Sequence, residues 1–313
     1  MVKTLLIIVG IAAAFGGGWF LAPRHSFFTD APYAVEDFPF INPSATLNLK
    51  KHFIINMSPL REEFTTIRAR FSQKTYVYFA YLNNDSWIGL NERDHFVAAS
   101  TIKVPLSMAI MKMVEEGKLA LDTPYTLAEE DLDDRFGDLY KRGVGATLTI
   151  RELIEVMLTQ SDNTSMKALF HIARDIGITD PLADVYAFMG WDSYANFGET
   201  PTYIEINLKT LSNMFLSLYN AKFVDLEHSQ IILSYLDHSI FNDEIPAGVP
   251  ESISVAHKVG MQVESNSYTD CGIVYAPNRN YLLCVGSEGA DKATADKFIA
   301  EISHAAYDFV INN

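Results

Sequence analysis

Ser100 and Lys103 stand three positions apart, where a helix is predicted to begin. Residues at that spacing share one face of a helical turn. The free N–H groups and partial positive charge of a helix start would stabilise a serine alkoxide or an oxyanion. Apolar Ile102, Val104 and Leu106 would desolvate Lys103 and lower its pKa, so that its amine could accept the serine proton. The pair predicts a nucleophilic serine with a lysine base, although a capping serine followed by a surface lysine gives the same local pattern.

Two further groups could complete such a site. Ser161, Asp162 and Asn163 form a polar turn between two predicted helices. There a second serine could relay a proton, and the Asn163 amide could both donate and accept hydrogen bonds, but the same residue types are ordinary helix caps. Lys258 lies in a predicted strand two residues before Gly260, which indicates close approach of the backbone to a ligand. The alternative is an edge-strand lysine.

Composition and missing motifs narrow the function further. The chain has 24 Lys and Arg against 39 Asp and Glu, a net charge of −15, and such a surface repels nucleic acid. The sequence contains no His-Glu-x-x-His, no paired Cys-x-x-Cys and no Walker loop, and Gly143-Val144-Gly145 lacks the third glycine of a dinucleotide loop. We therefore expect no metal, no cofactor and no nucleic-acid partner.

The elements that must position these residues follow from hydrophobic periodicity and turn signals. Helices are predicted over 60–71, 101–116, 150–160, 163–176, 181–189, 208–220 and 291–311. Strands are predicted over 75–82, 87–90, 252–259, 267–276 and 281–287. The strands at the two ends of the chain must share one sheet, because a lone hairpin is marginal in water. This predicts an α/β (α+β) fold: an antiparallel five-stranded sheet flanked by N- and C-terminal helices, with an inserted helical domain.

The N-terminal residues have the features of a targeting segment. An uncharged, mostly apolar run over 4–22 would span ~28 Å as a helix, about one hydrocarbon core. We expect residues 1–22 to be a membrane anchor; a cleaved signal and a buried helix are the alternatives. Residues 23–59 are interpreted as a tether with a first strand around 45–49, and 60–313 as the catalytic domain, its helical subdomain about 101–220. This organisation predicts an extracytoplasmic protein, anchored to the membrane or secreted if cleaved.

The three motifs together, Ser-x-x-Lys, Ser-Asp-Asn and Lys-x-Gly, resemble the set found in class A β-lactamases and penicillin-binding proteins. The likeness extends to 104–119, 148–153 and 270–275, and covers roughly residue 60 to the C-terminus. The resemblance implies that Ser100 is the acylated nucleophile and Lys103 its base or hydrogen-bond partner. It further implies that Ser161 passes a proton to the leaving nitrogen.

The resemblance also implies how a substrate is held. Asn163 would bind the substrate's amide side chain, and Lys258 would face its carboxylate. Gly260 would let the strand approach the substrate, and the backbone N–H groups of Ser100 and Met261 would form an oxyanion hole.

Two departures from the family pattern concern this same region. Val259 stands where the family usually has Thr or Ser, so a hydroxyl contact to the substrate carboxylate is missing. The family's deacylating glutamate should fall within 196–207, which contains Glu199 and Glu205, but neither sits in the Glu-x-x-x-Asn pattern. Glu199 is the better candidate for the base; an ordinary solvated loop glutamate is the alternative.

The sequence therefore predicts a monomeric serine hydrolase that forms an acyl-enzyme on a β-lactam or on a D-Ala amide of a peptidoglycan stem peptide, with slow β-lactam hydrolysis. A D-Ala-D-Ala peptidase is the first alternative, and an inactive peptidoglycan- or partner-binding module is the second. Three other features of the sequence carry expectations of their own. Cys271 and Cys284 are expected as free core thiols placed diagonally on one sheet face, with a disulfide left open. The acidic run over 129–134 is expected as a solvated loop. Phe136 is expected either at the mouth of the site or in the core.

Overall fold

The computed structural model describes residues 39–40, 56–190 and 205–313, which belong to the compact unit Phe38–Asn313. The apolar segment 1–22, the expected strand around 45–49 and Glu199 lie outside the described residues. Among the helices that are described, none has the length and apolar character needed to cross a bilayer.

The two ends of the domain meet in one antiparallel five-stranded sheet, as predicted. Its strand order is β2 (Ser86–Leu90), β1 (Lys74–Tyr81), β9 (Tyr281–Glu288), β8 (Ser267–Val274) and β7 (Val255–Gln262). The early and late strands join where β1 pairs with β9, from Lys74 opposite Glu288 to Tyr81 opposite Tyr281. β7 is thus an edge strand, and its N-terminal half carries Lys258.

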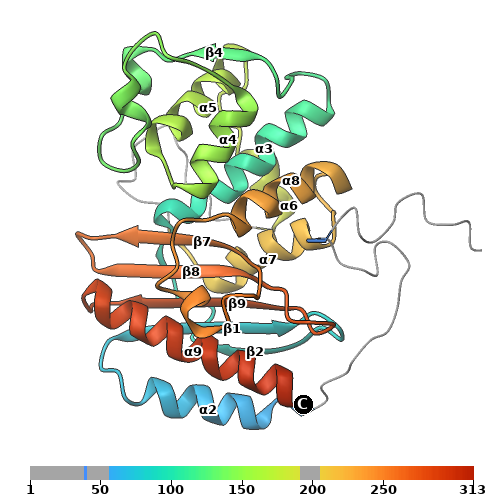
Figure 1. The fold of residues 1–313 in the computed structure, drawn as a ribbon, viewed down its shortest axis with the longest axis vertical. Helices are drawn as coiled ribbons and strands as arrows, with labels where there is room; N and C mark the ends of the chain where they lie inside the picture. The colour runs from blue at the N-terminus through green and yellow to red at the C-terminus, as the bar shows by residue number, and fades with distance from the viewer. Residues whose placement is uncertain (1–38, 41–55, 191–204) are drawn as a thin grey trace, which may run out of the picture. The chain divides into compact units, whose positions relative to one another are not determined.

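Helices cover both faces of this sheet (Figure 1). On one face lie α2 (Ser58–Arg68) and α9 (Lys292–Asn312). The helical part lies on the other side, and its helices are α3 (Lys103–Glu115), α4 (Ile150–Thr159), α5 (Asn163–Asp175), α6 (Ala183–Phe188), α7 (Leu208–Tyr219) and α8 (Leu226–Asp237). Because side chains alternate along a strand, β1 divides between two apolar cores: Tyr76 and Tyr78 join the helical side, and Val77 and Phe79 the side of α2 and α9.

Shorter elements complete the described chain. Two-stranded ribbons pair β3 (Phe96–Val97) with β6 (Glu205–Ile206), and β4 (Pro124–Thr126) with β5 (Thr147–Thr149). The 3-10 helices are η3 (Ala99–Ile102), η4 (Glu129–Asp131), η5 (Leu139–Arg142) and η6 (Ile245–Gly248). The helix predicted over 101–116 is therefore two elements, η3 and α3. α8 was not predicted at all, although Asp225 caps it and its buried positions recur at helical spacing.

The two cysteines correct one expectation. Cys271 on β8 lies directly opposite Cys284 on β9, with 3.9 Å between their Cα atoms, and a disulfide joins them. A tight turn over 277–280 would have paired Cys271 with Gly286, which is the diagonal placement that was expected. The observed connection instead pairs Val274 with Tyr281, and this register brings the two sulfurs together.

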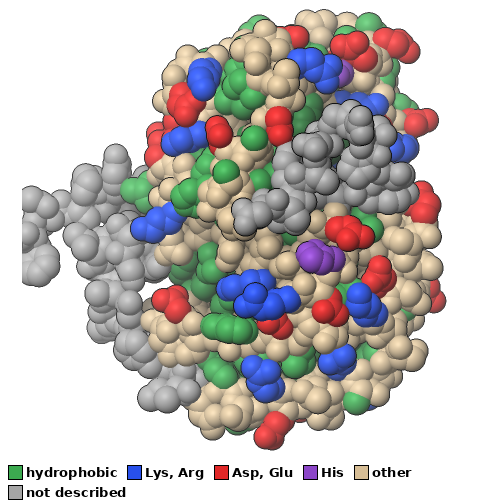
Figure 2. Space-filling model, turned by 180° about the vertical axis from the view of Figure 1, so that it is seen from behind, with side chains coloured by type: hydrophobic (Ala, Val, Ile, Leu, Met, Phe, Trp, Pro, Cys, Tyr) green, Lys and Arg blue, Asp and Glu red, His purple; other side chains and the backbone are tan. Residues whose placement is uncertain are grey.

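Charged side chains of both signs are interspersed on the face shown in Figure 2. On this face the acidic side chains are not gathered into one region.

Candidate active site

Ser100 lies in the short helix η3, and Lys103 is both the C-terminal cap of η3 and the first residue of α3. The Lys103 side-chain nitrogen Nζ lies 3.1 Å from Ser100 Oγ. The backbone N–H of Lys103 donates to the Ser100 carbonyl in a 3-10 turn, where residues i and i+3 eclipse one another, so the two side chains point in the same direction. The Thr101 hydroxyl donates to the carbonyl of Ala98 over 2.6 Å and fixes the start of the turn.

The backbone before Ser100 is held in a strained conformation by β7. Ala99 has φ 44°, in the left-handed region that non-glycine residues seldom adopt. Gly260 lies against this turn: a Cβ atom there would stand 2.9 Å from Thr101 Cγ2 and 3.0 Å from the Ala98 carbonyl oxygen. The glycine of the Lys-x-Gly motif is therefore needed for close packing of β7 on η3.

Lys103 is buried, and three further acceptors surround it. Its Nζ donates to the Ser161 carbonyl and lies 2.8 Å from Asn163 Oδ1 and 3.2 Å from Ser161 Oγ. Burial lowers the pKa of Lys103 well below its ordinary value, and the nearby charge of Lys258 lowers it further, against the opposing effect of Asp162 and other carboxylates. Burial and the charge of Lys258 thus both favour the neutral form of the Lys103 amine.

A neutral amine fits these contacts. The Ser161 carbonyl and the Asn163 side-chain oxygen can only accept, so they take the two N–H groups of the amine. The nitrogen lone pair then remains for a hydroxyl group, and Ser100 Oγ lies within reach. The arrangement can accept a proton from Ser100, which is the requirement for an activated serine.

The Ser161 turn is held by Asp162, whose role is structural. Asp162 is fully buried, and its carboxylate accepts hydrogen bonds from Ser165 N at 2.8 Å and Leu139 N at 2.9 Å. The first bond caps α5, and the second ties the turn to η5. Ser161 itself has φ 56° and is 1% exposed, so its backbone strain is maintained by the surrounding contacts.

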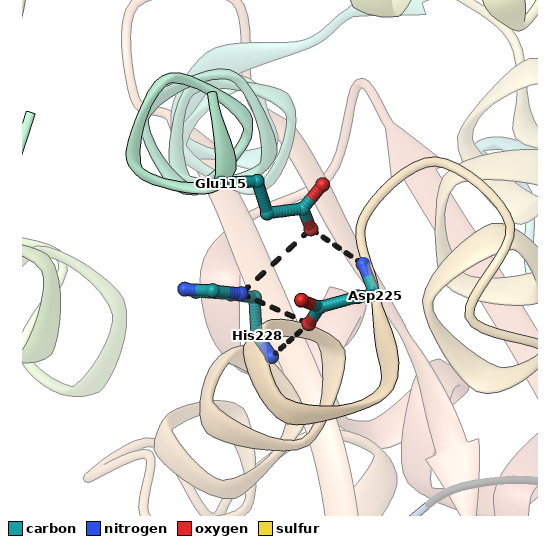
Figure 3. A group of neighbouring side chains, drawn as sticks. All are labelled: Glu115, Asp225 and His228. Carbon is teal, nitrogen blue, oxygen red and sulfur yellow. Dashed lines mark hydrogen bonds and ion pairs between the residues drawn. The ribbon is translucent and has the colours of Figure 1, made fainter. Parts of the chain in front are cut away.

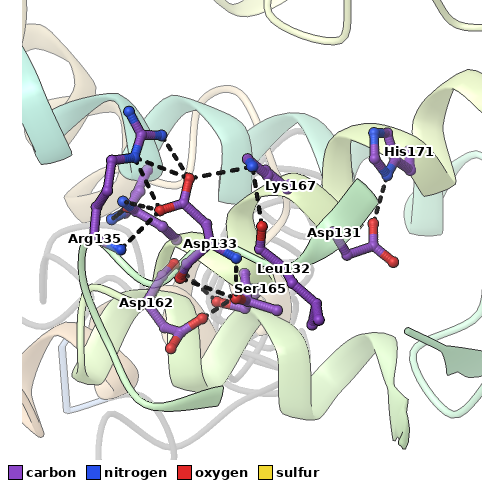
Figure 4. Close-up of polar contacts among 11 residues, drawn as sticks. Asp131, Leu132, Asp133, Arg135, Asp162, Ser165, Lys167 and His171 are labelled. Atoms are coloured by element: carbon purple, nitrogen blue, oxygen red, sulfur yellow. Dashed lines mark hydrogen bonds and ion pairs between the residues drawn. The ribbon is translucent and has the colours of Figure 1, made fainter. Parts of the chain in front are cut away.

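The acidic run over 129–134 is solvated at Glu129, Glu130 and Asp134, but not throughout. Asp131 and Asp133 are both buried, and Figure 4 shows the side chains that reach them. His171 and Tyr125 bind the Asp131 carboxylate. The sequence-based expectation was wrong for Asp131 and Asp133, because His171 and Lys167, which bind them, come from α5, far along the chain.

Asp133 connects this network to the site. Its carboxylate accepts hydrogen bonds from Arg135 Nε at 3.0 Å and Asn163 Nδ2 at 3.4 Å, and it pairs with Lys167 Nζ at 3.3 Å. Burial by itself would raise the pKa of Asp133, but the hydrogen bonds from Arg135, Asn163 and Lys167 lower it below its ordinary value. The ionised Asp133 therefore orients the Asn163 amide so that Oδ1 faces Lys103.

Replacing Asp133 by Ala is expected to slow acylation of Ser100 by about 10- to 100-fold, because a misplaced Asn163 no longer orients the Lys103 amine. The measurement is the rate of adduct formation with a penicillin, well below the melting temperature of each variant. Asp134→Ala is the matched control, since Asp134 is the exposed neighbour. Equal rates in the two variants would show that Asp133 has no role in acylation. Asp133→Glu keeps the carboxylate and should recover part of the lost rate.

Lys258 lies in β7 on the side of the sheet that faces Lys103. Its side chain has no exposed surface, its Nζ donates to the Val259 carbonyl at 3.3 Å, and it lies 5.5 Å from the centre of the Phe241 ring. Burial lowers the pKa of Lys258 to about 7, although the carboxylates of Asp270 and Glu244 raise it.

A cavity of about 360 Å³ opens beside Ser100. Its lining residues are Ala99, Ser100, Ile102, Lys103, Arg135, Phe136, Asn163, Met166, Met261, Gln262, Val263 and Glu264. Four of the predicted site residues thus reach this cavity, whereas Ser161 and Lys258 are buried beside it. Phe136, left open between mouth and core, lines the cavity. Of the two loop glutamates, Glu205 is exposed on β6, and Glu199 lies outside the described residues.

Glu115, Asp225 and His228 also bring potential ligand atoms within 4.8 Å of one another (Figure 3). Each carboxylate already has a structural partner. Asp225 Oδ1 accepts from the backbone and ring nitrogens of His228, both at 2.9 Å, and Glu115 accepts from Asp225 N and from Lys112. Asp225 thus caps α8, and its bond to Glu115 holds the start of α8 against the end of α3.

The chain is similar in sequence and in fold to known proteins. Residues 59–310 match the model of the family described as "Beta-lactamase enzyme family". Beta-lactamase VEB-1 of Pseudomonas aeruginosa is 20% identical over 258 residues, which cover 74% of this chain and 83% of that protein. A beta-lactamase of Phocaeicola vulgatus is 22% identical over 251 residues, which cover 74% of this chain and 78% of that protein.

Solved structures show the same architecture. The structure of PBP-A superposes with a TM-score of 0.73 at 20% identity, covering 85% of this chain and 100% of that one. A beta-lactamase from Sphaerobacter thermophilus DSM 20745 also gives a TM-score of 0.73 at 21% identity, and the match covers 83% of this chain and 99% of that one. Because the family model spans most of the sequence and the fold agrees with it, this chain belongs to the β-lactamase enzyme family of serine hydrolases.

Proposed function

We propose that this protein forms an acyl-enzyme at Ser100 on a β-lactam or a D-Ala amide, with Lys103 as the base. The observation that carries the proposal is the buried Lys103 amine, 3.1 Å from Ser100 Oγ, with two obligatory acceptors taking its N–H groups. The depressed pKa of Lys103 supports the same role, because only the neutral amine can accept a proton.

The proposed acylation proceeds in two stages, attack by Ser100 and departure of the nitrogen. Ser100 Oγ bonds to the substrate carbonyl carbon while its proton passes to Lys103. The oxyanion that results would accept hydrogen bonds from the backbone N–H groups of Ser100 and Met261. The carbon–nitrogen bond then breaks, and Lys103 returns the proton through Ser161 to the leaving nitrogen. Water later adds to the ester and releases the acid, and Ser100 regains its proton.

β-Lactam hydrolysis and D-Ala peptidase activity share this acylation and differ in how the ester is released. The relatives include beta-lactamases, and a solved structure of a PBP-A variant is described as an acyl-enzyme complex with penicillin G. The absence of the Glu-x-x-x-Asn pattern from residues 196–207 favours slow release and keeps the peptidase as the second candidate. The contacts of Lys103 argue against the inactive binding module.

Intact-mass spectrometry after exposure to penicillin G tests the proposal. We expect an adduct equal to the whole penicillin mass, mapped to Ser100, that disappears slowly. Ser100→Ala is the control and should give no adduct. A stable adduct identifies the penicillin-binding type of turnover, and a transient one identifies a β-lactamase. A wild-type protein that gives no adduct, even at early times, would overturn the proposal, and the inactive binding module would be the remaining alternative.

We also propose that residues 1–22 anchor the protein and hold the catalytic domain outside the cytoplasm, where stem peptides and β-lactams are met. The proposal rests on the uncharged run over 4–22. Cell fractionation of the full chain should recover it with membranes. Deletion of residues 1–22 should move it to the soluble fraction, and recovery of both forms as soluble protein would contradict the anchor.

A further inference from the structure

A second cavity, of about 580 Å³, lies where the end of α8, the 3-10 helix η6 and the start of β7 meet. It shares no lining residue with the cavity beside Ser100. Its volume is in the ordinary range of small-molecule sites, roughly 300–1,000 Å³. The carboxylates of Asp237 and Glu251 line it, and the described residues contribute no lysine or arginine to its wall. The wall therefore carries negative charge and offers no lysine or arginine of its own to neutralise it.

A nearly buried imidazole, from His257, forms part of this wall. His257 is 1% exposed and lines the cavity. His257 and Lys258 are successive residues of β7, so their side chains lie on opposite faces of the sheet. Gly272 on β8 pairs with His257, and a Cβ atom at Gly272 would stand 2.4 Å from His257 Cβ. The glycine therefore makes room for the imidazole and fixes where it lies.

Hydrogen bonds set the roles of the two ring nitrogens of His257. Nδ1 lies 2.9 Å from both carboxylate oxygens of Asp270, which is fully buried and also accepts from Ile245 N at 3.0 Å. Because a carboxylate only accepts, Nδ1 carries the hydrogen, and Nε2 of the neutral ring is an acceptor. Nε2 has no partner in the described part of the chain, and it is not among the unpartnered side-chain atoms that are closed off from solvent. This nitrogen is therefore left to meet a ligand in the cavity.

The other polar groups of the wall also favour a ligand that donates hydrogen bonds. The carboxylates of Asp237 and Glu251 can only accept. Burial raises the pKa of Asp237, although hydrogen bonds from Val255 N–H and the Ser254 hydroxyl oppose this effect. A cation beside Asp237 would compensate for the water that its carboxylate has lost. The Ser254 hydroxyl and the Asn242 amide line the same cavity and can bond to hydroxyl groups of a ligand.

The spacing of these acceptors does not suit a single metal ion. Among the described residues, the only group of His, Cys, Asp and Glu side chains with three ligand atoms within 4.8 Å of one another is Glu115, Asp225 and His228. The acceptors of Asp237, Glu251 and His257 are therefore more widely spaced than one ion can bridge. A ligand that satisfies them must be an organic molecule with donors at more than one point.

We propose that this cavity binds an organic ammonium ion that also carries hydroxyl groups and has the size of an amino sugar. Its ammonium group would donate to the Asp237 carboxylate, and its hydroxyl groups would bond to His257 Nε2 and the Asn242 amide. Glu251, exposed at the edge of the cavity, would add electrostatic attraction. The inference does not depend on acylation of Ser100.

The test titrates the full chain with D-glucosamine at neutral pH, where most of its amine is protonated, and follows binding by saturation-transfer NMR of the sugar. We expect saturable binding with a Kd on the order of 1–10 mM, the strength of a few polar contacts. N-acetyl-D-glucosamine keeps the sugar ring and lacks the charge. It should bind at least about tenfold more weakly, the effect of one charge-assisted hydrogen bond.

Charge-removing variants test the wall of the cavity. Asp237→Asn keeps the size of the side chain and should weaken glucosamine binding by about tenfold. Asp243→Asn is the matched control, since Asp243 is an exposed neighbour that does not line the cavity, and this variant should keep the wild-type Kd. Glu251→Gln changes an exposed residue and decides the matter if Asp237→Asn folds poorly; it should weaken binding by about threefold at low salt.

The histidine ring signals locate the bound sugar. In two-dimensional NMR spectra of the full chain, the His257 ring signal, assigned from its loss in His257→Gln, should shift with glucosamine. The same concentration of N-acetyl-D-glucosamine should leave it in place. His304, exposed on α9 and absent from the wall of this cavity, is the internal control and should not shift with either sugar.

Each contrary result rejects a defined part of the inference. Equal affinity for the two sugars would overturn the ammonium class of ligand. An unchanged Kd in folded Asp237→Asn, or a His257 signal that stays in place at saturation, would overturn the site. Glucosamine binding that does not saturate by ~50 mM would overturn both. None of these results bears on the penicillin adduct at Ser100, so the proposed function stands or falls separately.

Discussion

Lys103→Met is expected to slow acylation of Ser100 by about 10²–10⁴-fold, the usual effect of losing a general base. Methionine keeps the length and apolar character of the buried side chain but cannot accept a proton. It also leaves the Ser161 carbonyl and Asn163 Oδ1 without their donor, so part of the loss arises from reorganisation of the turn. The measurement is the rate of penicillin adduct formation at Ser100.

The pH profile distinguishes a base from a purely structural lysine. Because the pKa of Lys103 is lowered by burial, acylation by the wild type should rise with pH through that pKa and then level off once the amine is neutral. Lys103→Met should lose this rise. Lys112→Met is the control, since Lys112 lies on the same helix and pairs with Glu115 away from the cavity. A Lys103→Met variant within threefold of the wild type at all pH values would rule out the base role.

Release of the acyl group is expected to be slow, by about 10²–10⁴-fold relative to an enzyme with a well-placed base for water. Residues 196–207 lack the glutamate pattern that would supply such a base, and Glu205 is exposed on β6. Glu199→Gln should therefore change the decay of the penicillin adduct little.

The decay is followed by intact mass after excess penicillin is removed, and nitrocefin hydrolysis gives the steady-state rate. Glu205→Gln is the matched control, because it carries the same change on the same stretch of chain. Rapid nitrocefin hydrolysis that Glu199→Gln abolishes and Glu205→Gln does not would identify Glu199 as the hydrolytic base and contradict the expectation.

Local sequence was sufficient for those parts of the site that residues close together in the chain form. Ser100 and Lys103 face the same way because three residues make about one helical turn. The Thr149–Glu152 capping box that starts α4 is a local signal of the same kind. The hairpin of β1 and β2 and the late strands were also recognisable from alternation and turn residues. α8 could have been found from Asp225 and the helical spacing of its apolar residues, since that signal is local too.

Contacts between distant segments were not predictable from such patterns. Asp133 appeared as one of several surface acids until α5 placed Lys167 and Asn163 beside it. The β8–β9 register, and with it the pairing of Cys271 with Cys284, depended on a loop whose conformation its turn residues did not define.

The sequence by itself determined the fold class, the family and the identity of the Ser100–Lys103 pair, because each depends on residue types at fixed spacing. Only the tertiary structure decided that the pKa of Lys103 is lowered and that Lys258 is buried. The pKa of a lysine depends on how completely the fold removes it from water and on which charges lie near it. Lys258 Nζ lies 5.5 Å from the centre of the Phe241 ring only because the folded chain brings the segment after α8 to β7, and no local pattern encodes such a contact.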